Sequence, residues 1–462
     1  MKKKKAPTPS DALVFFGATG DLAYKQIFPA LQAMVRHGHL DMPVVGVAKG
    51  GVDLDHLKAR AEDSLKNHGG IDPAAFTKLC SLLRYVEGDY ADPNTFTTLR
   101  KTLGNAKNPI HYLAIPPSLF ATVAEALQKS GCAKGARVVI EKPFGHDRAS
   151  AKVLNRTLHS VFPEHSIFRI DHYLGKEPVQ NLVYFRHANP LVEAGWSRHH
   201  IESVQITMAE NFGVSDRGRF YDEAGAIRDV VQNHMLQLIA CIGMESAAGG
   251  GHEHQRDART KLLKAIRPLD SAHVARGQFR GYRDVAGVAP GSTVETFAIL
   301  RFEIKNKRWD GVPFFVRVGK CLPVTATEIL IRFKQRRHPV LDDTSAPPAD
   351  YYRFQLGPKV VIALGANVKK PGELLSGETT ELTAQHQAPD EMAPYERLLT
   401  DASNGDPTLF AREDAVEQSW RIVDPILANP VPLQEYEPGT WGPAKVSPLL
   451  TPAGGWHNPT PA

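Results

Sequence analysis

The sequence is poor in cysteine, in net charge and in long apolar runs, and each shortage excludes a class of protein. Only 4 of its 462 residues are cysteine, and no two of them lie at the spacing of a zinc-binding or redox pair. We therefore expect reduced thiols and no metal. Basic residues exceed acidic ones by only 5, too few for a nucleic-acid-binding surface. No apolar run approaches the about 20 residues that span a bilayer, so we expect neither a nucleic acid nor a membrane as partner.

The composition is otherwise that of an ordinary globular protein, with 42% hydrophobic and 23% charged residues. A length of 462 residues predicts two domains. The first ten residues, MKKKKAPTPS, are predicted to form a flexible basic tail. They do not predict an export signal, because the following apolar run ALVFF passes directly into GATGD without a cleavage site. We therefore expect a cytoplasmic location.

In the first third of the chain, short apolar runs alternate with longer helical stretches. The strand-like runs are ALVFFG, PVVGVA, LLRYVEG, PIHYLAI and ARVVIE. Apolar strands separated by helices of this length predict a parallel sheet that is covered on both faces. Residues 11–171 are therefore predicted to form an α/β doubly wound, Rossmann-like domain that binds a dinucleotide.

After residue 171 the pattern changes to longer alternating strands with few helices between them, such as IESVQITMAE, TVETFAILRFEI, PFFVRVG and EILIRFK. This pattern favours an α+β domain over residues 172–462 with a large, mainly antiparallel sheet. Helices are expected over residues 222–242 and 409–427. The segment 246–259 is rich in glycine and polar residues and predicts a loop, and the proline-rich end from Pro430 predicts irregular chain.

A glycine turn stands where the first strand ends and a helix begins, in the sequence Gly17-Ala-Thr-Gly20-Asp-Leu-Ala. Such a turn lets the backbone approach a pyrophosphate, which the amides and dipole at a helix N-terminus stabilise. A plain strand-to-helix turn has the same spacing. The second strand ends at Lys49, where a cation favours the 2′-phosphate of NADP over NAD. A solvated lysine is the alternative, so NAD stays open.

Two further motifs place polar groups where parallel sheets bind ligands. In VVIEKPFG, Lys142 follows a buried strand and could donate to a substrate hydroxyl, while Pro143 would fix the backbone through a cis bond. Capping of the strand is the structural alternative. The segment FRIDHYLGK, residues 168–176, gathers imidazole, phenol and ammonium groups that suit a phosphate dianion. A polar linker between domains would look similar.

The helical pattern YDEAGAIRDVVQNHMLQL carries Asp229 and His234 among apolar residues. A histidine, whose ordinary pKa is near neutrality, suits a general base that takes a hydroxyl proton while hydride leaves the same carbon. In an ideal α-helix, two residues five apart lie roughly 140° apart, so one substrate would have to lie across both. A core histidine with a structural role is the alternative.

Taken together these motifs resemble the glucose-6-phosphate dehydrogenase family. GATGDLA, VVIEKPFG, RIDHYLGKE, AENFG, YDEAGAIRDVVQNH and VPFFVRVGK occur in the family's order, and the ending YEPGTWGP also fits. The resemblance covers nearly the whole chain, and RIDHYLGK is its most specific signature. It implies oxidation of C1 of D-glucose 6-phosphate to 6-phospho-D-glucono-1,5-lactone, with NADP as hydride acceptor, in a homodimer or homotetramer.

The resemblance also implies a role for each matching residue. His234 would be the catalytic base and Asp171 would pair with it. The predicted substrate contacts are Lys142, His172, Tyr173, Lys176, Glu210, Asp229 and Lys320. The predicted cofactor contacts are Gly17, Thr19, Gly20, Asp21, Leu22, Lys49, Asp89, Tyr90, Tyr112 and Lys142.

The chain departs from the family pattern at four positions. Tyr24 and Gln26 replace lysines after the glycine turn, Lys49 replaces an arginine, and Thr325 replaces a later cation. Lysine lacks the two-pronged guanidinium that grips a phosphate, so preference for NADP over NAD would be relaxed. Two other functions stay open at this point: an NAD(P)-dependent dehydrogenase of another sugar, and a non-catalytic relative that serves as an assembly or regulatory subunit.

Overall fold

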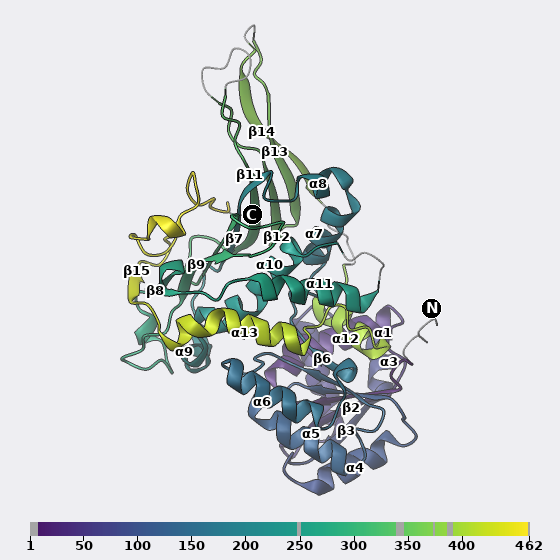
Figure 1. Cartoon of the computed structure of the whole chain (residues 1–462). Coiled ribbons are helices and arrows are strands. Elements are labelled where there is room, and N and C mark those ends of the chain that lie inside the picture. The colour runs from purple at the N-terminus through teal and green to yellow at the C-terminus, as the bar shows by residue number, and fades with distance from the viewer. Residues whose placement is uncertain (1–7, 247–250, 339–345, 373–374, 386–390, 461–462) are drawn as a thin grey trace. The chain divides into compact units, whose positions relative to one another are not determined.

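The computed structural model describes residues 8–246, 251–338, 346–372, 375–385 and 391–460, and the chain divides into two compact units (Figure 1). The first unit comprises residues up to 176 together with residues 247–257 and 392–417. The second comprises residues 177–246, 258–391 and 418–462. The sequence predicts one boundary at residue 171, whereas two later segments also belong to the first unit. A linear pattern of strands and helices carries no signal for such a return.

The first unit is built on a parallel sheet with the strand order β3-β2-β1-β4-β5-β6. Each residue of β1, β2 and β4 is buried, as expected for apolar strands covered on both faces. The predicted doubly wound fold is confirmed. The strands are β1 (Ala12–Phe16), β2 (Val44–Ala48), β3 (Leu83–Glu87), β4 (Pro109–Leu113), β5 (Arg137–Ile140) and β6 (Ile167–Arg169).

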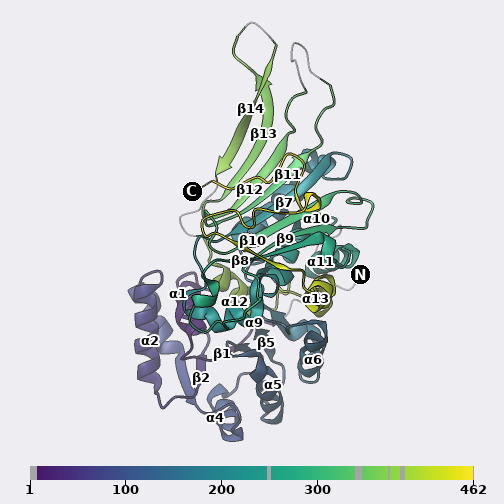
Figure 2. The same cartoon turned by 90° about the vertical axis from the view of Figure 1, so that its left-hand side faces the viewer.

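Helices cover both faces of this sheet, with α1 and α2 on one side and α5 and α6 on the other (Figure 2). The side chains of Asp53, Asp72, Asp92 and Asp147 each accept an amide hydrogen bond at the start of a helix. The helices are η1, a π-helical turn (Ala23–Ile27), α1 (Phe28–Arg36), α2 (Leu54–Asn67), α3 (Pro73–Leu82), α4 (Pro93–Leu103), α5 (Phe120–Lys129), α6 (Arg148–His159) and α12 (Pro394–Asn404).

The predicted basic tail is only partly within the described residues. Residues 1–7 lie outside them, but residues 8–10 are held to the first unit. The amide of Ser10 donates to the carbonyl of Ser403 (2.7 Å), and Arg137 donates to the carbonyl of Thr8 (2.6 Å) and to the hydroxyl of Ser10 (2.8 Å). A flexible tail over all ten residues is therefore wrong for its last three.

The second unit is built on a large mixed sheet with the order β14-β13-β12-β11-β7-β10-β9-β8-β15. Most neighbours are antiparallel, as predicted, while β10 and β7, and β15 and β8, are parallel pairs. The strand β15 lies in the proline-rich end that was expected to be irregular. The strands are β7 (Ile201–Ala209), β8 (Val274–Phe279), β9 (Phe297–Glu303), β10 (Pro313–Gly319), β11 (Ala326–Phe333), β12 (Tyr351–Gly357), β13 (Val361–Lys369), β14 (Gly377–Gln385) and β15 (Leu433–Tyr436).

The helical stretch predicted over residues 222–242 is present as α9 (Gly218–Ala226), the π-helix η5 (Ile227–Met235) and α10 (Leu236–Gly243). The stretch predicted over 409–427 is present as α13 (Glu413–Ala428). The remaining α-helices are α7 (Glu177–Ala188), α8 (Pro190–Gly195) and α11 (His252–Ala265). Single 3-10 turns are η2 (Pro117–Leu119), η3 (Glu164–Ser166), η4 (Ser215–Arg217), η6 (Ser271–His273), η7 (Tyr282–Asp284) and η8 (Pro448–Leu450).

The loop predicted over residues 246–259 is wrong from His252 onward, where α11 begins. Residues 247–250 lie outside the described residues. Arg256 pairs with Glu253 one turn earlier (2.9 Å), and Arg412 pairs with Glu253 (3.1 Å) and Asp257 (2.6 Å). Ion pairs from a partner about 150 residues away in sequence stabilise a helix whose own composition favours a loop.

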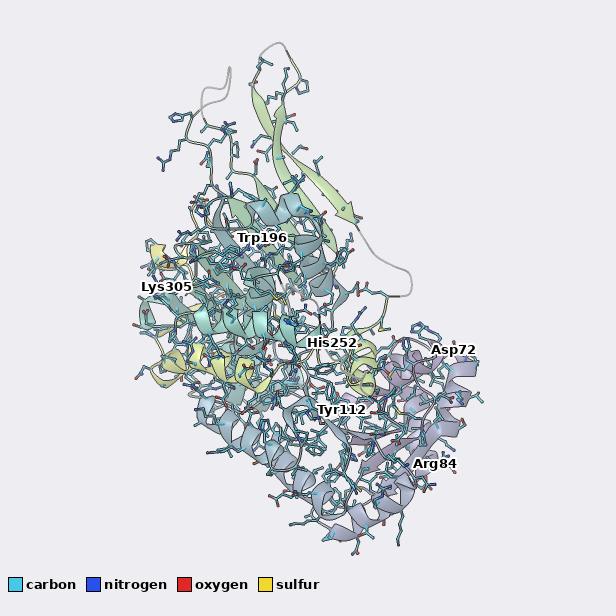
Figure 3. The ribbon with its side chains drawn as sticks, turned by 45° about the vertical axis from the view of Figure 1, so that its right-hand side comes forward. Asp72, Arg84, Tyr112, Trp196, His252 and Lys305 are labelled. Atoms are coloured by element: carbon cyan, nitrogen blue, oxygen red, sulfur yellow. The ribbon has the colours of Figure 1, made fainter. Side chains whose placement is uncertain are left out.

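The two faces of the large sheet differ in polarity, because alternate residues of a strand point to opposite sides. Val204 and Ile206 belong to the apolar face, on which α7 packs against β12. Trp196 is a buried residue of the same unit (Figure 3). Gln205 and Thr207 belong to the other face, which is polar yet buried.

The chain's own C-terminal end covers this polar face. Arg317 donates to the side chain of Asn458 (2.8 Å) and to the carbonyl of His457 (3.0 Å), and its guanidinium lies over the rings of Trp441 and Trp456. The amide of His457 donates to Gln205 (2.9 Å). We call residues 453–458 with these contacts the C-terminal clasp. Among the described residues, no helix has the length and apolar content needed to cross a bilayer.

Candidate active site

The residues predicted for the cofactor side lie at one edge of the parallel sheet. Gly17 follows β1, Lys49 follows β2, Asp89 follows β3, Lys142 follows β5 and Asp171 follows β6. Because all six strands are parallel, their carboxyl ends share this edge. The strand order reverses between β1 and β4, and such reversals are where doubly wound sheets bind ligands.

The turn after β1 requires glycine at position 17. Its φ is +82°, and a Cβ there would lie 2.2 Å from the carbonyl oxygen of Ala114. The amide of Gly20 donates to the carbonyl of Gly17 (2.9 Å), and this hydrogen bond closes the turn around Thr19. The helix begins at Asp21, so Leu22 lies in its first turn. The turn thus leads the chain directly into a helix N-terminus, as a pyrophosphate site needs.

Tyr90 supports this turn from the neighbouring loop. The amide of Gly17 donates to the Tyr90 hydroxyl (2.8 Å), and that hydroxyl donates to the carbonyl of Val47 (3.1 Å). Burial raises the pKa of Tyr90, so the phenol stays protonated and keeps both hydrogen bonds. Tyr90, predicted from the resemblance as a cofactor contact, therefore also holds the glycine turn in place.

Lys49 and Asp89 form an ion pair at this edge, with 2.8 Å between the ammonium nitrogen and a carboxylate oxygen. The hydrogen bond to Asp89 raises the pKa of Lys49. The pKa of Asp89 is lowered, first by the hydrogen bond from the amide of Ala91 and then by Lys49. Both side chains are exposed. The cation predicted to attract a 2′-phosphate thus has a carboxylate partner, which reduces its attraction for a second anion.

Tyr24, at a position where the family has lysine, ties η1 to α2 instead. Its hydroxyl donates to Asp63 (2.5 Å) and accepts from Asn67 (2.8 Å), and the guanidinium of Arg60 lies 4.9 Å from the centre of its ring. The hydrogen bond to Asp63 raises the pKa of Tyr24. The other replacement, Gln26, is exposed. The position of Tyr24 therefore serves packing in this chain rather than charge.

A buried carboxyl group, Glu141, lies beside the predicted substrate contact Lys142. Tyr112, buried inside the first unit (Figure 3), donates its hydroxyl to Glu141 (2.5 Å), and the hydroxyl of Tyr395 also bonds Glu141. Burial raises the pKa of Glu141 to about 7. The bond from Lys142 to Pro143 is cis, as predicted. The sequence places Glu141 beside Lys142 at the end of a strand but gives it no role, and sequence reasoning missed Tyr395.

Within the predicted phosphate-binding segment, residues 168–176, residues 171–176 are folded into consecutive tight turns. The amide of Tyr173 donates to the carboxylate of Asp171 (3.1 Å), and the amide of Lys176 donates to the carbonyl of Tyr173 (3.2 Å). The Lys176 ammonium lies 3.8 Å from the centre of the Tyr173 ring, a cation–π contact. Tyr173 is buried, so its ring holds the Lys176 side chain in position. The ring of His172, in the same segment, stacks on the ring of Tyr395.

Arg169 belongs to the predicted segment but lies outside these turns. Its guanidinium is fully buried and donates to both carboxylate oxygens of Glu164 (2.9 and 3.0 Å) and to Asn155 (3.0 Å). The density of polar groups in residues 168–176 therefore has two sources. Arg169 is structural, while His172 and Lys176 are at the carboxyl edge of the sheet.

In the second unit, Glu210 and Lys320 follow the parallel strands β7 and β10. The amide of Glu210 donates to the carbonyl of Gly319 (3.0 Å), and the Lys320 ammonium lies 2.5 Å from the Glu210 carboxylate. The Tyr436 hydroxyl donates to the carbonyl of Lys320 (2.6 Å). The parallel register therefore brings together an acid and a base that are 110 residues apart in sequence.

Asp229 and His234 both lie in η5, and the π-helix corrects the predicted angle between them. A π-helix joins residues i and i+5 by hydrogen bonds, so residues five apart lie one turn apart on the same side. The expected separation of roughly 140° is therefore wrong. Asn233 stabilises the wide turn by donating to the carbonyl of Arg228 (3.1 Å), and His234 is buried.

Tyr221 connects these groups within the second unit. It is buried, and burial, followed by the nearby carboxylates of Asp229, Glu295 and Glu210, raises its pKa well above the ordinary value. The ammonium of Lys320 lies 5.2 Å from the centre of its ring. The Tyr221 phenol thus has three predicted substrate contacts as neighbours: Asp229, Glu210 and Lys320.

Thr325, at the position where the family has a cation, bonds the loop after β7. Its hydroxyl donates to the side chain of Asn211 (2.7 Å) and accepts from the amide of the same residue (3.1 Å). It orders the residue that follows Glu210. Asp171 belongs to the first unit and His234 to the second, so their predicted pairing stays a prediction.

The fold and these groups define a class of protein. A doubly wound sheet with a glycine turn at its switch point binds a dinucleotide, and the second unit supplies a histidine, carboxylates and a lysine. This is the arrangement of a nicotinamide-dependent oxidoreductase that acts on an alcohol.

Comparison with known proteins identifies the family. Residues 14–181 match the glucose-6-phosphate dehydrogenase NAD binding domain, and residues 183–457 match the glucose-6-phosphate dehydrogenase C-terminal domain. Glucose-6-phosphate 1-dehydrogenase 1 of Mycobacterium bovis is 43% identical, and the alignment covers 97% of each chain. The crystal structure of the Mycobacterium avium enzyme has a TM-score of 0.91 at 42% identity and covers 98% of this chain and 99% of that one.

A second solved structure, glucose-6-phosphate dehydrogenase in complex with its substrate glucose-6-phosphate, has a TM-score of 0.90 at 33% identity and covers 99% of this chain and 100% of that one. The chain belongs to the glucose-6-phosphate dehydrogenase family. The resemblance found in the sequence motifs is thereby confirmed over nearly the whole chain.

Proposed function

We propose that this protein oxidises D-glucose 6-phosphate at C1 to 6-phospho-D-glucono-1,5-lactone. The C1 hydrogen leaves as hydride to the nicotinamide of NADP+, and the proton of the C1 hydroxyl goes to His234. The observation that carries the proposal is the group formed by Asp229 and His234, on one side of η5, together with Glu210 and Lys320 around Tyr221. Family membership supplies the substrate class.

His234 is the proposed base because it is the histidine of that group and is buried away from bulk water. Asp171 is proposed to stabilise the protonated imidazole. Glu210 and Asp229 accept hydrogen bonds from sugar hydroxyls, and Lys320, paired with Glu210, donates to another. Lys142 bridges sugar and cofactor.

The 6-phosphate is proposed to bind the segment 171–176. His172 and Lys176 each donate a hydrogen bond, and both are held before substrate arrives: His172 by stacking on Tyr395, and Lys176 by the Tyr173 ring. Such preorganisation lowers the entropy lost on binding. Two charge-assisted hydrogen bonds, each of about 1.5–3 kcal/mol, give the phosphorylated sugar a large advantage over free glucose.

NADP+, the proposed hydride acceptor, fits the residues present at the sheet edge. The Gly17–Gly20 turn with Thr19, Asp21 and Leu22 would hold the pyrophosphate, and Lys49 would meet the 2′-phosphate. The Lys49–Asp89 ion pair supports weak discrimination, so NAD+ is proposed as a second acceptor. Tyr90 acts through the glycine turn, and Tyr112 through Glu141.

The test is His234→Asn, which keeps a polar side chain but removes the base. We expect turnover to be lost while calorimetry still detects binding of glucose 6-phosphate and NADP+. Unchanged turnover would remove His234 from the mechanism. Turnover on free glucose equal to that on glucose 6-phosphate would contradict the phosphate assignment. A homodimer or homotetramer and a cytoplasmic location remain proposals from family membership.

A further inference from the structure

The C-terminal end of α1 and the first turn of α12 bring together two histidines and a buried glutamate. The Nδ1 atom of His37 lies 2.5 Å from the carboxylate of Glu396, and that of His39 lies 3.8 Å from the same oxygen. One ligand atom from each of the three residues lies within 4.8 Å of the others. We propose that these residues form a zinc site that ties α1 to α12.

The donor set selects the metal. Two imidazole nitrogens and one carboxylate match Zn2+, which takes four ligands in a tetrahedron and is completed here by water. Mg2+ and Ca2+ prefer oxygen ligands alone. With bonds of about 2.0–2.2 Å, a tetrahedral zinc ion holds its ligand atoms roughly 3.3 Å apart. The two imidazole nitrogens lie 2.5 and 3.8 Å from the Glu396 oxygen, on both sides of that value, and the ligand atoms of the three residues lie within 4.8 Å of one another, so side-chain rotations would have to bring them into place.

The backbone already fixes both histidines. His37 ends α1 by donating its amide to the carbonyl of Ala33 (2.9 Å), and Gly38 adopts the left-handed conformation with φ +73°. The amide of His39 then donates to the carbonyl of Met34 (2.7 Å). This helix-ending turn places two imidazoles, separated by one residue, at a fixed position.

The Glu396 carboxylate is buried and requires a positive charge beside it, whereas His37 and His39 are partly exposed. The Glu396 side chain is 2% exposed, whereas those of His37 and His39 are 21% and 33% exposed. A buried carboxylate is stable only beside positive charge, which either a proton on histidine or a metal ion supplies. Solvent access to both imidazoles gives the ion a route in.

Arg36 is the main competitor. Its guanidinium lies 3.4 Å from Nε2 of His37. If Nδ1 of His37 binds zinc, Nε2 carries the ring hydrogen and cannot accept a hydrogen bond from Arg36. The Arg36 side chain is exposed, so it can turn away, but its charge opposes the metal. Removing that charge is therefore expected to strengthen zinc binding.

A second His/Glu cluster provides a matched control. His159 lies 3.0 Å from Glu164 and 3.3 Å from Glu413, but the carboxylate of Glu164 is already paired with Arg169 (2.9 Å) and faces Arg256 (3.6 Å). Two buried guanidinium groups repel a divalent cation. We therefore expect no zinc at this second cluster.

The site also has a place in the architecture. Glu396 follows Tyr395, whose hydroxyl bonds Glu141 and whose ring stacks on His172. A metal bound to Glu396 would hold the first turn of α12 next to residues of the proposed active site. The sequence predicted no metal because it shows no cysteine pair or Cys/His cluster of zinc spacing, and Glu396 lies 359 residues from His37.

The test measures binding of Zn2+ alone to the full chain after treatment with a chelator. We expect the wild type to bind one more equivalent of Zn2+ than His39→Gln, with affinity at that site falling at least about tenfold in the variant. His159→Gln should bind like the wild type, and Arg36→Gln should bind at least as tightly. His39 is partly exposed, so this variant should melt like the wild type without metal.

Two further readouts decide the outcome. Zn2+ should raise the melting temperature of the wild type and of His159→Gln but not that of His39→Gln. Co2+ should give the visible absorption of a four-coordinate site, and this absorption should be lost in His39→Gln. Equal zinc stoichiometry and affinity in wild type and His39→Gln, or a loss confined to His159→Gln, would overturn the proposal.

Discussion

The Lys49–Asp89 ion pair makes the choice between NADP+ and NAD+ measurable through two single substitutions. Lys49→Ala removes the cation proposed to meet the 2′-phosphate. Asp89→Asn keeps an oxygen that accepts the amide of Ala91 (2.9 Å) but removes the charge that occupies Lys49. The two variants should move the preference for NADP+ in opposite directions.

The magnitudes follow from the exposure of the pair. Both side chains are exposed, 74% for Lys49 and 48% for Asp89, and exposed ion pairs contribute little because water screens them. Freeing Lys49 from Asp89 should therefore lower the KM for NADP+ by up to about fivefold. Losing a charge-assisted hydrogen bond to the 2′-phosphate should lower kcat/KM for NADP+ in Lys49→Ala by about 10- to 150-fold.

The assay is initial-rate kinetics with glucose 6-phosphate at saturation and each cofactor varied in turn. NAD+ has no 2′-phosphate, so its kcat/KM should change little in either variant. Because screening weakens exposed charges, the effect of Asp89→Asn should shrink as ionic strength rises. Equal losses for both cofactors in Lys49→Ala would refute the assignment of Lys49 to the 2′-phosphate.

Three other substitutions test separate parts of the site. Gly17→Ala, which places a Cβ 2.2 Å from the carbonyl of Ala114 at φ +82°, should cost about 1–3 kcal/mol of stability and abolish cofactor binding by calorimetry. Glu141→Gln should flatten the dependence of urea stability on pH between about 4.5 and 7. Thr325→Lys restores the family's cation and should lower the KM for glucose 6-phosphate about tenfold or more, despite losing the bonds to Asn211.

The direction of the Glu141 effect follows from proton linkage. Its pKa rises from 4.5 to about 7 on folding, so in that range the folded protein binds more protons than the unfolded chain. Stability of the wild type should therefore fall as pH rises from about 4.5 to 7, by roughly 3 kcal/mol in all. The glutamine carries no titrating proton. An equal slope in both proteins would show that Glu141 does not titrate in this range.

Gly17→Ala and Thr325→Lys can each give a result that contradicts the prediction. Gly291→Ala is the control for the glycine turn, because a Cβ there meets no atom within 4 Å. Normal NADP+ binding by Gly17→Ala would show that the turn tolerates a side chain. An unchanged KM in Thr325→Lys would place that position away from the phosphate.

Much of the fold could be predicted because its signals are local. The apolar runs that end at Phe16, Ala48 and Ile140 fit only buried strands, and the helices between them fix a parallel sheet. The glycine turn could also be predicted, because its glycines stand directly between the first strand and a helix. The residues of the second unit came from family motifs, which carry positions but not geometry.

The rest depends on contacts between distant residues or on a change in helix type. The π-helix η5 moves Asp229 and His234 to one side, and a pattern read with an α-helical period gives the wrong angle. The helix α11 depends on Arg412, far along the chain. The pairing of Lys49 with Asp89 joins the ends of two strands, so neither residue shows in sequence that it neutralises the other.

The C-terminal clasp makes the carboxyl end of this chain a poor place for a fusion partner. Asn458 and His457 accept hydrogen bonds from the buried guanidinium of Arg317, and the ring of Trp456 stacks on it, so residues 456–458 still contact the interior. An affinity tag or fluorescent protein joined at the carboxyl end would pull on that packing.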